Sequence, residues 1–240
     1  LGVMTGFTDD LREKILGTNS HLVISKFGAN LNDYRQVMEK IRGGPGVAAS
    51  TPFILFQGML SSGTNVSGVV LRGIDAATAP AVIRIQETLV EGRLDQLEKE
   101  QPSSDGSKLP GIIIGKELSK LLGVGLGEPL TVISPSGLIT PSGLMPRWKK
   151  FFVVGIFESG MYEYDTTLAY ISMKNAQSFL KMADEATGVE VKVSDIYQVK
   201  TFADAIRNKI GLSYLVRDWM EMHRNLYSAL KLEKTAMFII

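Results

Sequence analysis

Hydrophobic and polar residues recur along the chain with the periods of helices and strands, and these periods predict its secondary structure. Apolar side chains at Met4, Phe7, Leu11 and Ile15 have helical spacing, and Gly17 follows as an expected C-cap. The next segment predicts a strand at 21–27, a helix at 32–42 ended by Gly43-Gly44-Pro45, and strands at 47–60 and 66–74.

A similar order returns near the C-terminus. The pattern predicts a strand at 189–193, a helix at 201–210 and a strand at 213–219. The two stretches together are similar to a split β-α-β unit, the arrangement of ferredoxin-like domains. We therefore expect an α+β fold whose first unit combines residues 1–75 with residues 187–240.

Residues 76–186 predict a second, inserted unit of mixed α/β structure. Its expected elements are a helix in 76–92 broken near Pro80, a strand, short helix and strand in 111–134, strands at 150–160 and 167–173, and a helix at 174–182.

Composition narrows the classes of function. The chain has 240 residues, 45% hydrophobic and 21% charged, which is enough for a packed core. A formal net charge of +1 argues against a nucleic-acid binder, which usually carries a strong basic excess. The absence of cysteine excludes disulfides, thiolate metal sites and cysteine nucleophiles.

The two ends of the sequence bear on whether the chain is a domain of a membrane protein. No run of 18 apolar residues occurs, but the chain begins "LGVMTGF" and stops within an apolar run at "TAMFII". We expect a soluble domain excised from between two membrane helices, held by the first helix and by a helix in 221–240 that leave the body on one side. The alternative is a C-terminal strand docked in the sheet.

Motifs for catalysis or metal binding are not found. His21 and His223 are the only histidines, and they lie far apart in the sequence. No H-E-x-x-H, G-x-S-x-G or G-x-x-x-x-G-K-[ST] motif occurs. The "GVGLG" run at 123–127 follows a helix, so it predicts a helix C-cap and a turn. We therefore expect no enzyme activity, no metal and no cofactor.

Three carboxylates, Glu158, Glu163 and Asp165, cluster in "FESGMYEYDTT". A carboxylate pair can serve acid–base chemistry. Without a local His or Lys, a turn whose side chains bond their own backbone is the preferred interpretation.

The segment 135–150 stands out because it is predicted to be a loop and yet contains four large apolar side chains. It separates predicted strands at 130–134 and 151–157, and its 16 residues exceed the usual hairpin loop. Three prolines restrict its backbone, which lowers the entropy lost on binding. It is therefore expected to be a stiff apolar docking element; the alternative is a loop folded back over its own domain.

Basic and aromatic residues follow the apolar ones, as is typical of interfaces steered by charge. The candidate partner-binding residues are Pro135, Leu138, Ile139, Pro141, Leu144, Met145, Pro146, Arg147, Trp148 and Lys149.

Three motifs carry a family resemblance: "VMTGFTDDLREKILG", "GIFESGMYEYDTTLAYISMKNAQSFL" and "ALKLEKTAMFII". With them the chain resembles, over essentially its whole length, the periplasmic domain of the LolC/LolE family, the permeases of the lipoprotein-releasing ABC transporter. The stretch "IIIGKELSKLLGVGLGEPLTV" is also similar to MacB-type periplasmic core domains.

The resemblance implies a porter-like subdomain and an inserted Sabre-like subdomain. It also implies a Hook-like loop at 135–150 that recruits a LolA-like periplasmic lipoprotein carrier. Thr131 stands where the family has a basic residue before this loop, and Trp148 stands at a polar position after it. These two departures put part of the family's contact surface in doubt.

The resemblance further implies a location at the periplasmic face of the bacterial inner membrane and a lipoprotein substrate. The implied partners are a LolE-like subunit or a second copy, and a LolD-like ATPase. Three alternatives stay open: a MacB-type efflux or mechanotransmission domain that contacts an adaptor, a soluble enzyme with a site between subdomains, and a passive module of a division-type permease.

Overall fold

The structure is a computed structural model that describes residues 19–103, 106–140 and 143–222; at 136, 138–140 and 143–144 it describes the backbone alone. The predicted N-terminal helix, the predicted helix in 221–240 beyond residue 222, and His223 therefore lie outside the described residues. None of the helices in the described ranges is long and apolar enough to cross a bilayer.

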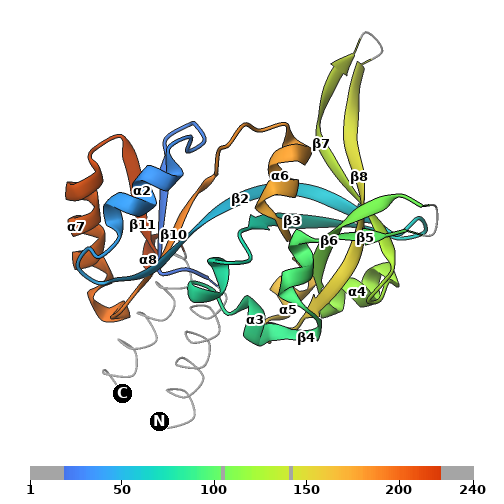
Figure 1. Cartoon of the computed structure of the whole chain (residues 1–240), viewed down its shortest axis with the longest axis horizontal. Coiled ribbons are helices and arrows are strands. Elements are labelled where there is room, and N and C mark those ends of the chain that lie inside the picture. The colour runs from blue at the N-terminus through green and yellow to red at the C-terminus, as the bar shows by residue number, and fades with distance from the viewer. Residues whose placement is uncertain (1–18, 104–105, 141–142, 223–240) are drawn as a thin grey trace, which may run out of the picture.

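Helices of 4 to 12 residues and strands of 3 to 15 residues are interspersed along the described chain (Figure 1). The strands are β1 (Leu22–Lys26), β2 (Val47–Ser61), β3 (Val66–Ile74), β4 (Leu89–Gly92), β5 (Glu100–Pro102), β6 (Lys108–Gly115), β7 (Pro129–Thr140), β8 (Gly143–Phe157), β9 (Leu168–Ser172), β10 (Gly188–Val193) and β11 (Tyr214–Asp218). The helices are α2 (Tyr34–Ile41), α3 (Ile85–Thr88), α4 (Lys116–Leu122), α5 (Tyr162–Thr167), α6 (Met173–Leu180), α7 (Val199–Ile210) and α8 (Trp219–Met222), with 3-10 turns η1 (Ala79–Ala81), η2 (Leu94–Glu98) and η3 (Ile196–Gln198).

One end of the sheet has the strand order β11-β1-β10-β2, with every neighbouring pair antiparallel. Helix α2 connects β1 to β2, and α7 connects β10 to β11, so each pair of connected strands has another strand between them. This is the split β-α-β arrangement that the repeated pattern predicts. Helices α2 and α7 pack side by side and bury their apolar faces against the strands (Figure 1).

At the other end, the strand pairings close a ring. Strand β2 pairs with β3, β3 with β9, β9 with β6, β6 with β8, β8 with β7, and β7 again with β2. A ring of six strands is too narrow for a channel, and side chains fill it. The buried side chains of this ring include Leu60, Leu71, Ile114, Val132 and Phe151, all without exposed surface.

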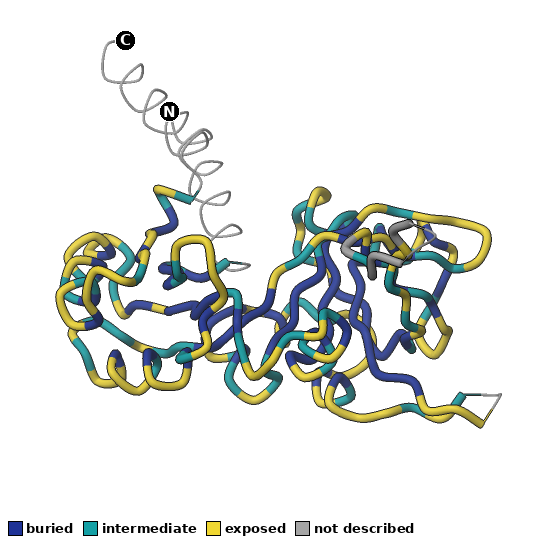
Figure 2. The backbone as a smooth tube through the Cα atoms, turned by 90° about the horizontal axis from the view of Figure 1, so that it is seen from above, coloured by how far each residue is buried: buried dark blue, intermediate teal, exposed yellow. Residues whose placement is uncertain are grey.

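Strand β2 belongs to both ends of the sheet. Its first half pairs with β10 and its second half with β3 and β7. Buried residues accordingly continue along the strands from one end to the other (Figure 2). The division of the chain into one unit of residues 1–75 with 187–240 and a second unit of residues 76–186 stays a prediction. Strand β2 pairs with strands of both expected units, β10 in the first and β7 in the second.

The segment after β3 differs from the helix expected in 76–92. It forms η1, α3 and β4, with Pro80 in the first turn of η1. Short pieces suit this segment because it covers the outer face of the ring, where Ala79, Val82 and Ile83 pack with Phe157 and Tyr170 in a second apolar cluster. In contrast, the predicted C-cap in "GVGLG" is confirmed: Gly123 ends α4 with φ 67°.

Candidate functional site: the hairpin of β7 and β8

The predicted loop at 135–150 is wrong as secondary structure, because β7 and β8 continue through it. Their backbones pair as far as Thr140 and Gly143, and the hairpin projects away from the rest of the fold (Figure 1). Antiparallel pairing satisfies the backbone N–H and C=O groups that an irregular loop of this length would leave to solvent. The Pro-Ser-Gly run at 135–137 is typical of a turn, but β7 continues through it.

A bulge explains how the strands accommodate proline. Ser134 pairs with Arg147 and Leu138 with Met145, so three residues of β7 face one residue of β8. Pro135 and Pro146 lie within this interruption, where a ladder N–H is not needed. At Gly137 a Cβ would lie 1.8 Å from the carbonyl oxygen of Met145, so a side chain has no room there.

The base of the hairpin is tied to α6. The Arg147 guanidinium donates from Nη1 to the carbonyl oxygen of Leu180, 2.7 Å away, at the C-terminal end of α6. A cation is favourable there because the last carbonyls of a helix lack partners within it. The Lys149 ammonium lies 3.4 Å from Oδ1 of Asn175 and 5.7 Å from the centre of the Phe151 ring. These two predicted binding residues therefore also orient the hairpin.

A row of apolar side chains crosses the outer face of the ring at this base. Met59 of β2 pairs directly with Ile133 of β7, which pairs directly with Trp148 of β8. Residues directly opposite one another share a face of a sheet. Met59 is 40% exposed and Trp148 is 68% exposed, so Trp148 is not packed into its own domain.

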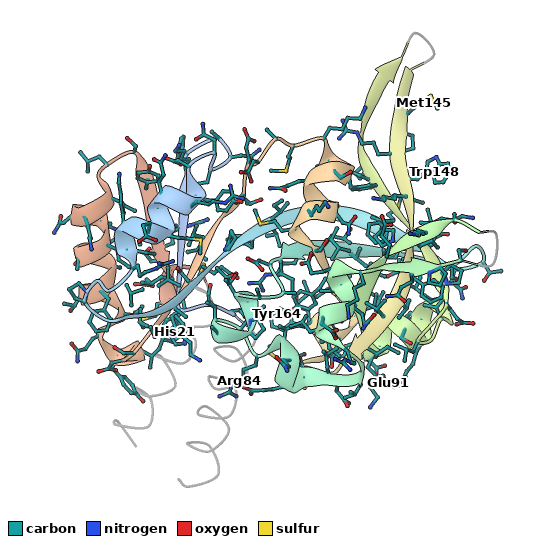
Figure 3. All side chains as sticks on the ribbon, viewed as in Figure 1. His21, Arg84, Glu91, Met145, Trp148 and Tyr164 are labelled. Atoms are coloured by element: carbon teal, nitrogen blue, oxygen red, sulfur yellow. The ribbon has the colours of Figure 1, made fainter. Side chains whose placement is uncertain are left out.

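The opposite side of the hairpin base borders a shallow groove. It has a volume of about 340 Å³ and runs between residues 145–149 of β8 and the end of α6, where Ser178, Phe179 and Lys181 line it. Met145, at its upper end, is 59% exposed (Figure 3).

The structure describes the remaining predicted binding residues to different extents. Pro135 and Pro146 are exposed at the bulge. Leu138, Ile139 and Leu144 are described by backbone alone, and Pro141 lies outside the described residues. The sequence analysis missed Met59, Ile133 and the end of α6, because only the folded chain brings these segments to the hairpin.

Two of the three carboxylates in "FESGMYEYDTT", those of Glu158 and Asp165, have structural partners. Asp165 is buried, and its Oδ1 accepts hydrogen bonds from the backbone N–H and the hydroxyl of Ser159, at 2.8 Å and 2.7 Å. Glu158 pairs with Lys116 at 2.9 Å. Within the described ranges, no group of three or more His, Asp or Glu side chains is arranged to hold a metal ion.

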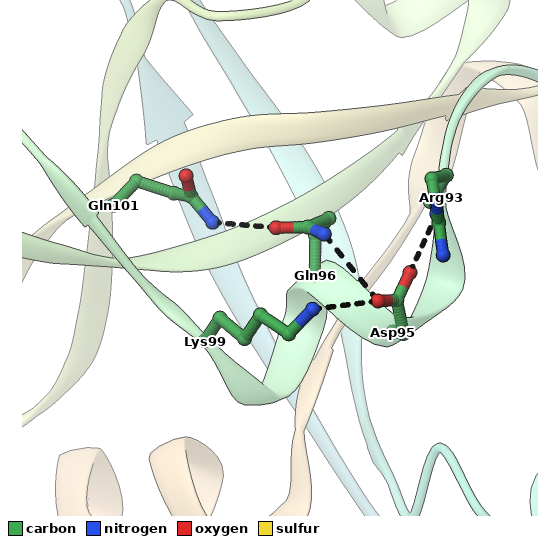
Figure 4. A network of polar contacts seen from close by, with 5 residues as sticks. All are labelled: Arg93, Asp95, Gln96, Lys99 and Gln101. Atoms are coloured by element: carbon green, nitrogen blue, oxygen red, sulfur yellow. Dashed lines mark hydrogen bonds and ion pairs between the residues drawn. The ribbon is translucent and has the colours of Figure 1, made fainter.

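A groove of about 690 Å³ lies beside β4 and η2 and offers little for catalysis. One of its acids, Asp95, accepts hydrogen bonds from Lys99 at 2.7 Å and from Arg93 at 2.9 Å (Figure 4). The hydrogen bond from Lys99, with that from Arg93, lowers the pKa of Asp95. A carboxylate held ionised by two exposed cations is suited to fastening η2 rather than to general acid catalysis.

Comparison with known proteins finds relatives that match the entire chain, whereas no family model matches it. The chain is 33% identical over 240 residues to the lipoprotein-releasing system transmembrane protein LolC of Xylella fastidiosa and 30% identical over 244 residues to LolC of Neisseria meningitidis. It is 22% identical to LolE of Haemophilus influenzae. In each case all of the chain aligns, but it spans 56% of the relative's length.

Solved structures with the same fold are periplasmic or extracellular domains of transporters. The periplasmic region of MacB from Actinobacillus actinomycetemcomitans has a TM-score of 0.53 and 13% identity, covering 90% of this chain and 95% of that one. The extracellular domain of the noncanonical ABC-type transporter YknZ has a TM-score of 0.51 and 13% identity, covering 83% and 99%. The fold class expected from the sequence is confirmed: mixed α and β structure of the MacB type.

Proposed function

The chain belongs to the LolC/LolE family, and on that premise we propose that it recruits a periplasmic lipoprotein carrier through the hairpin of β7 and β8. In this proposal it is the periplasmic part of an inner-membrane permease. A lipoprotein extracted from the membrane passes to a LolA-like carrier docked here. The energy comes from a LolD-like ATPase, and the partner permease is LolE-like or a second copy.

One observation supports the docking role above all others: a hairpin that projects from the ring and keeps large apolar side chains in water. Met145 is 59% exposed and Trp148 is 68% exposed on β8 (Figure 3). Exposed apolar groups on a projecting element are typical of surfaces that another protein covers. Paired strands also hold the hairpin in one shape, which reduces the entropy lost on binding.

The roles of the individual residues follow from their positions. The apolar residues Leu138, Ile139, Leu144 and Met145 enter an apolar cavity of the carrier. Trp148 covers the rim of the contact, and Lys150, which is exposed, supplies positive charge that steers an acidic partner. Arg147 and Lys149 contribute by fixing the base of the hairpin against α6.

A charge-introducing pair of substitutions tests the proposal. Leu144→Asp with Met145→Asp is expected to abolish carrier binding in a pull-down while the circular dichroism spectrum and the melting temperature stay unchanged. Binding is lost because burying two carboxylates in an apolar cavity costs roughly several kcal/mol.

The matched control makes the same chemical change at two exposed apolar positions far from the hairpin. Phe27 is 93% exposed and Leu212 lies fully in solvent. Phe27→Asp with Leu212→Asp is expected to bind the carrier normally. Undiminished binding by the hairpin variant would remove the docking role.

A second candidate is a MacB-type efflux or mechanotransmission domain that contacts an adaptor protein. The similarity in fold to the periplasmic region of MacB favours it, although at 13% identity it indicates the fold alone. Partner choice separates the two candidates: co-purification with an adaptor, and none with a lipoprotein carrier, would favour the MacB-type function.

A further inference from the structure

Two exposed methionines lie around the base of the hairpin. Met145 of β8 is 59% exposed, and Met59 of β2 is 40% exposed. The other methionines of the described ranges are half-buried, as Met38 is, or buried, as Met173 is. Methionine is common in hydrophobic cores, where oxidants do not reach its sulfur. Exposure therefore separates the two methionines at the hairpin from the rest.

The surroundings of Met145 leave its thioether accessible. Its partner across the hairpin is Leu138, next to the bulge. The side chain of Met145 lies at one end of the groove of about 340 Å³ that Trp148 and Phe179 also line (Figure 3). One water molecule occupies about 30 Å³ in the liquid. An oxidant as small as hydrogen peroxide therefore has room to approach the sulfur.

No thiol competes for such an oxidant within this chain. Cysteine is absent from the sequence, and a cysteine thiolate is the sulfur group that oxidises most readily. Under the proposed function the chain lies in the periplasm, which is an oxidising compartment. Methionine is therefore the sulfur-containing residue available for oxidation, and Met145 is the most exposed methionine of the described ranges.

We propose that Met145 is a reversible oxidation site, at which a peroxide converts the thioether into methionine sulfoxide and thereby weakens docking of the carrier. One oxygen atom passes from the peroxide to the sulfur. The O–O bond breaks, an S=O bond forms, and with hydrogen peroxide the other oxygen leaves as water. The sulfur loses two electrons and the peroxide gains them. Sulfoxide reductases reverse the change by returning two electrons and two protons, with release of water.

The position of Met145 explains why its oxidation acts on docking. Under the proposed function, on which this inference rests for its effect on binding, the side chain enters an apolar cavity of the carrier. The sulfoxide is polar, and inside such a cavity its oxygen loses its hydrogen bonds to water. The affinity for the carrier is expected to fall about ten-fold, which corresponds to about 1.4 kcal/mol. The fold is expected to stay intact, because Met145 lies outside the core.

Peptide mass spectrometry tests the site without any partner. The chain is treated with hydrogen peroxide, and the addition of oxygen at each methionine is followed with time. We expect Met145 to be oxidised fastest among the methionines of the described ranges, followed by Met59, with the buried Met173 slowest. Oxidation of Met145 no faster than that of the half-buried Met38 would overturn the proposal.

The effect on docking is measured after the peroxide has been removed, so that the carrier itself is not oxidised. For each protein, the affinity for the carrier after treatment is compared with the affinity before it. Treatment is expected to weaken binding by the unmodified chain about ten-fold. The substitution Met145→Leu nearly conserves the volume of the side chain and removes the sulfur. Treatment is expected to leave the affinity of this variant unchanged, whatever its value before treatment.

The matched control is Met59→Leu, the same change at the other exposed methionine. Treatment is expected to weaken its binding as much as that of the unmodified chain. Both proteins are expected to recover with methionine sulfoxide reductases, one for each sulfoxide epimer. An equal loss by Met145→Leu would refute the switch and assign the effect to oxidation elsewhere, with the exposed Trp148 the nearest site.

The two measurements separate this inference from the proposed function. Failure of the untreated chain to bind a carrier would contradict the proposed function. The rates of peptide oxidation would still decide whether Met145 is the oxidation site.

Discussion

Single residues decide whether the hairpin of β7 and β8 has its observed shape. Gly137 allows the two backbones to approach at the bulge, and Arg147 anchors the base to the end of α6. Neither role follows from residue type alone. Gly137 belongs to a Pro-Ser-Gly run that predicts a turn, and Arg147 to a basic cluster that predicts a contact with a partner.

The substitution Gly137→Ala tests the bulge. Its Cβ would lie 1.8 Å from the Met145 carbonyl oxygen, so one strand must shift. Such overpacking costs about 1–3 kcal/mol. Amide hydrogen exchange is expected to accelerate in residues 129–157, and carrier affinity to fall.

The matched control is Gly68→Ala on β3, where a Cβ meets nothing within 4 Å. We expect no loss of protection in the hairpin from this variant. Equal exchange in the hairpins of the two variants would show that the close approach at Gly137 is not required.

His21, whose ring nitrogen Nδ1 accepts a hydrogen bond from the N–H of Val193, makes the fold sensitive to acid. Burial, followed by the charge of Lys192, lowers the pKa of His21 below its ordinary 6.5. As pH falls below about 6.5, the unfolded chain takes up a proton that the folded chain resists, so folding loses stability. Urea denaturation at pH 7.5 and pH 5.5 is expected to show a smaller loss for His21→Asn, whose Oδ1 can accept from Val193. An equal loss in both proteins would place the acid sensitivity elsewhere.

At the scale of elements, periodicity predicted most of the strands and helices, because each buries one face and its apolar residues repeat accordingly. It failed where another effect was stronger. The strands of the hairpin continue through Pro135 and Pro146 because the bulge removes the need for their N–H groups. The helix expected in 76–92 is replaced by short pieces, since that segment has to follow the curved outer face of the ring.

Shortening the hairpin separates its role in binding from its role in folding. Replacing residues 135–146 with Asn-Gly joins the paired residues Ser134 and Arg147 through a two-residue turn. The contacts of β7 with β2 and of β8 with β6 remain, so the melting temperature is expected to change little while carrier binding is lost. Retained binding by the folded, shortened protein would exclude the hairpin as the docking element.

At the scale of the whole molecule, the closed ring was not predictable from the sequence. Its closure depends on β7 pairing with β2, whose paired residues are about 70 positions apart, and no local pattern specifies such a partner. The same limit applies to the candidate site. Residues 145–149 are contiguous and were predicted as one group, whereas Met59 and Phe179 reach them only through the fold.

The hairpin extends from one side of the six-stranded ring. A buried ion pair between Arg72 of β3 and Glu190 of β10 joins the ring to the other end of the sheet.

Site-specific crosslinking tests the docking claim most directly. Because the chain has no cysteine, Met145→Cys and Leu212→Cys each carry a single photo-crosslinker at an exposed position, one on the hairpin and one remote from it. With the lipoprotein carrier present, we predict a crosslinked complex from position 145 and none from position 212. Crosslinking from position 212 alone, or equally from both, would contradict the account.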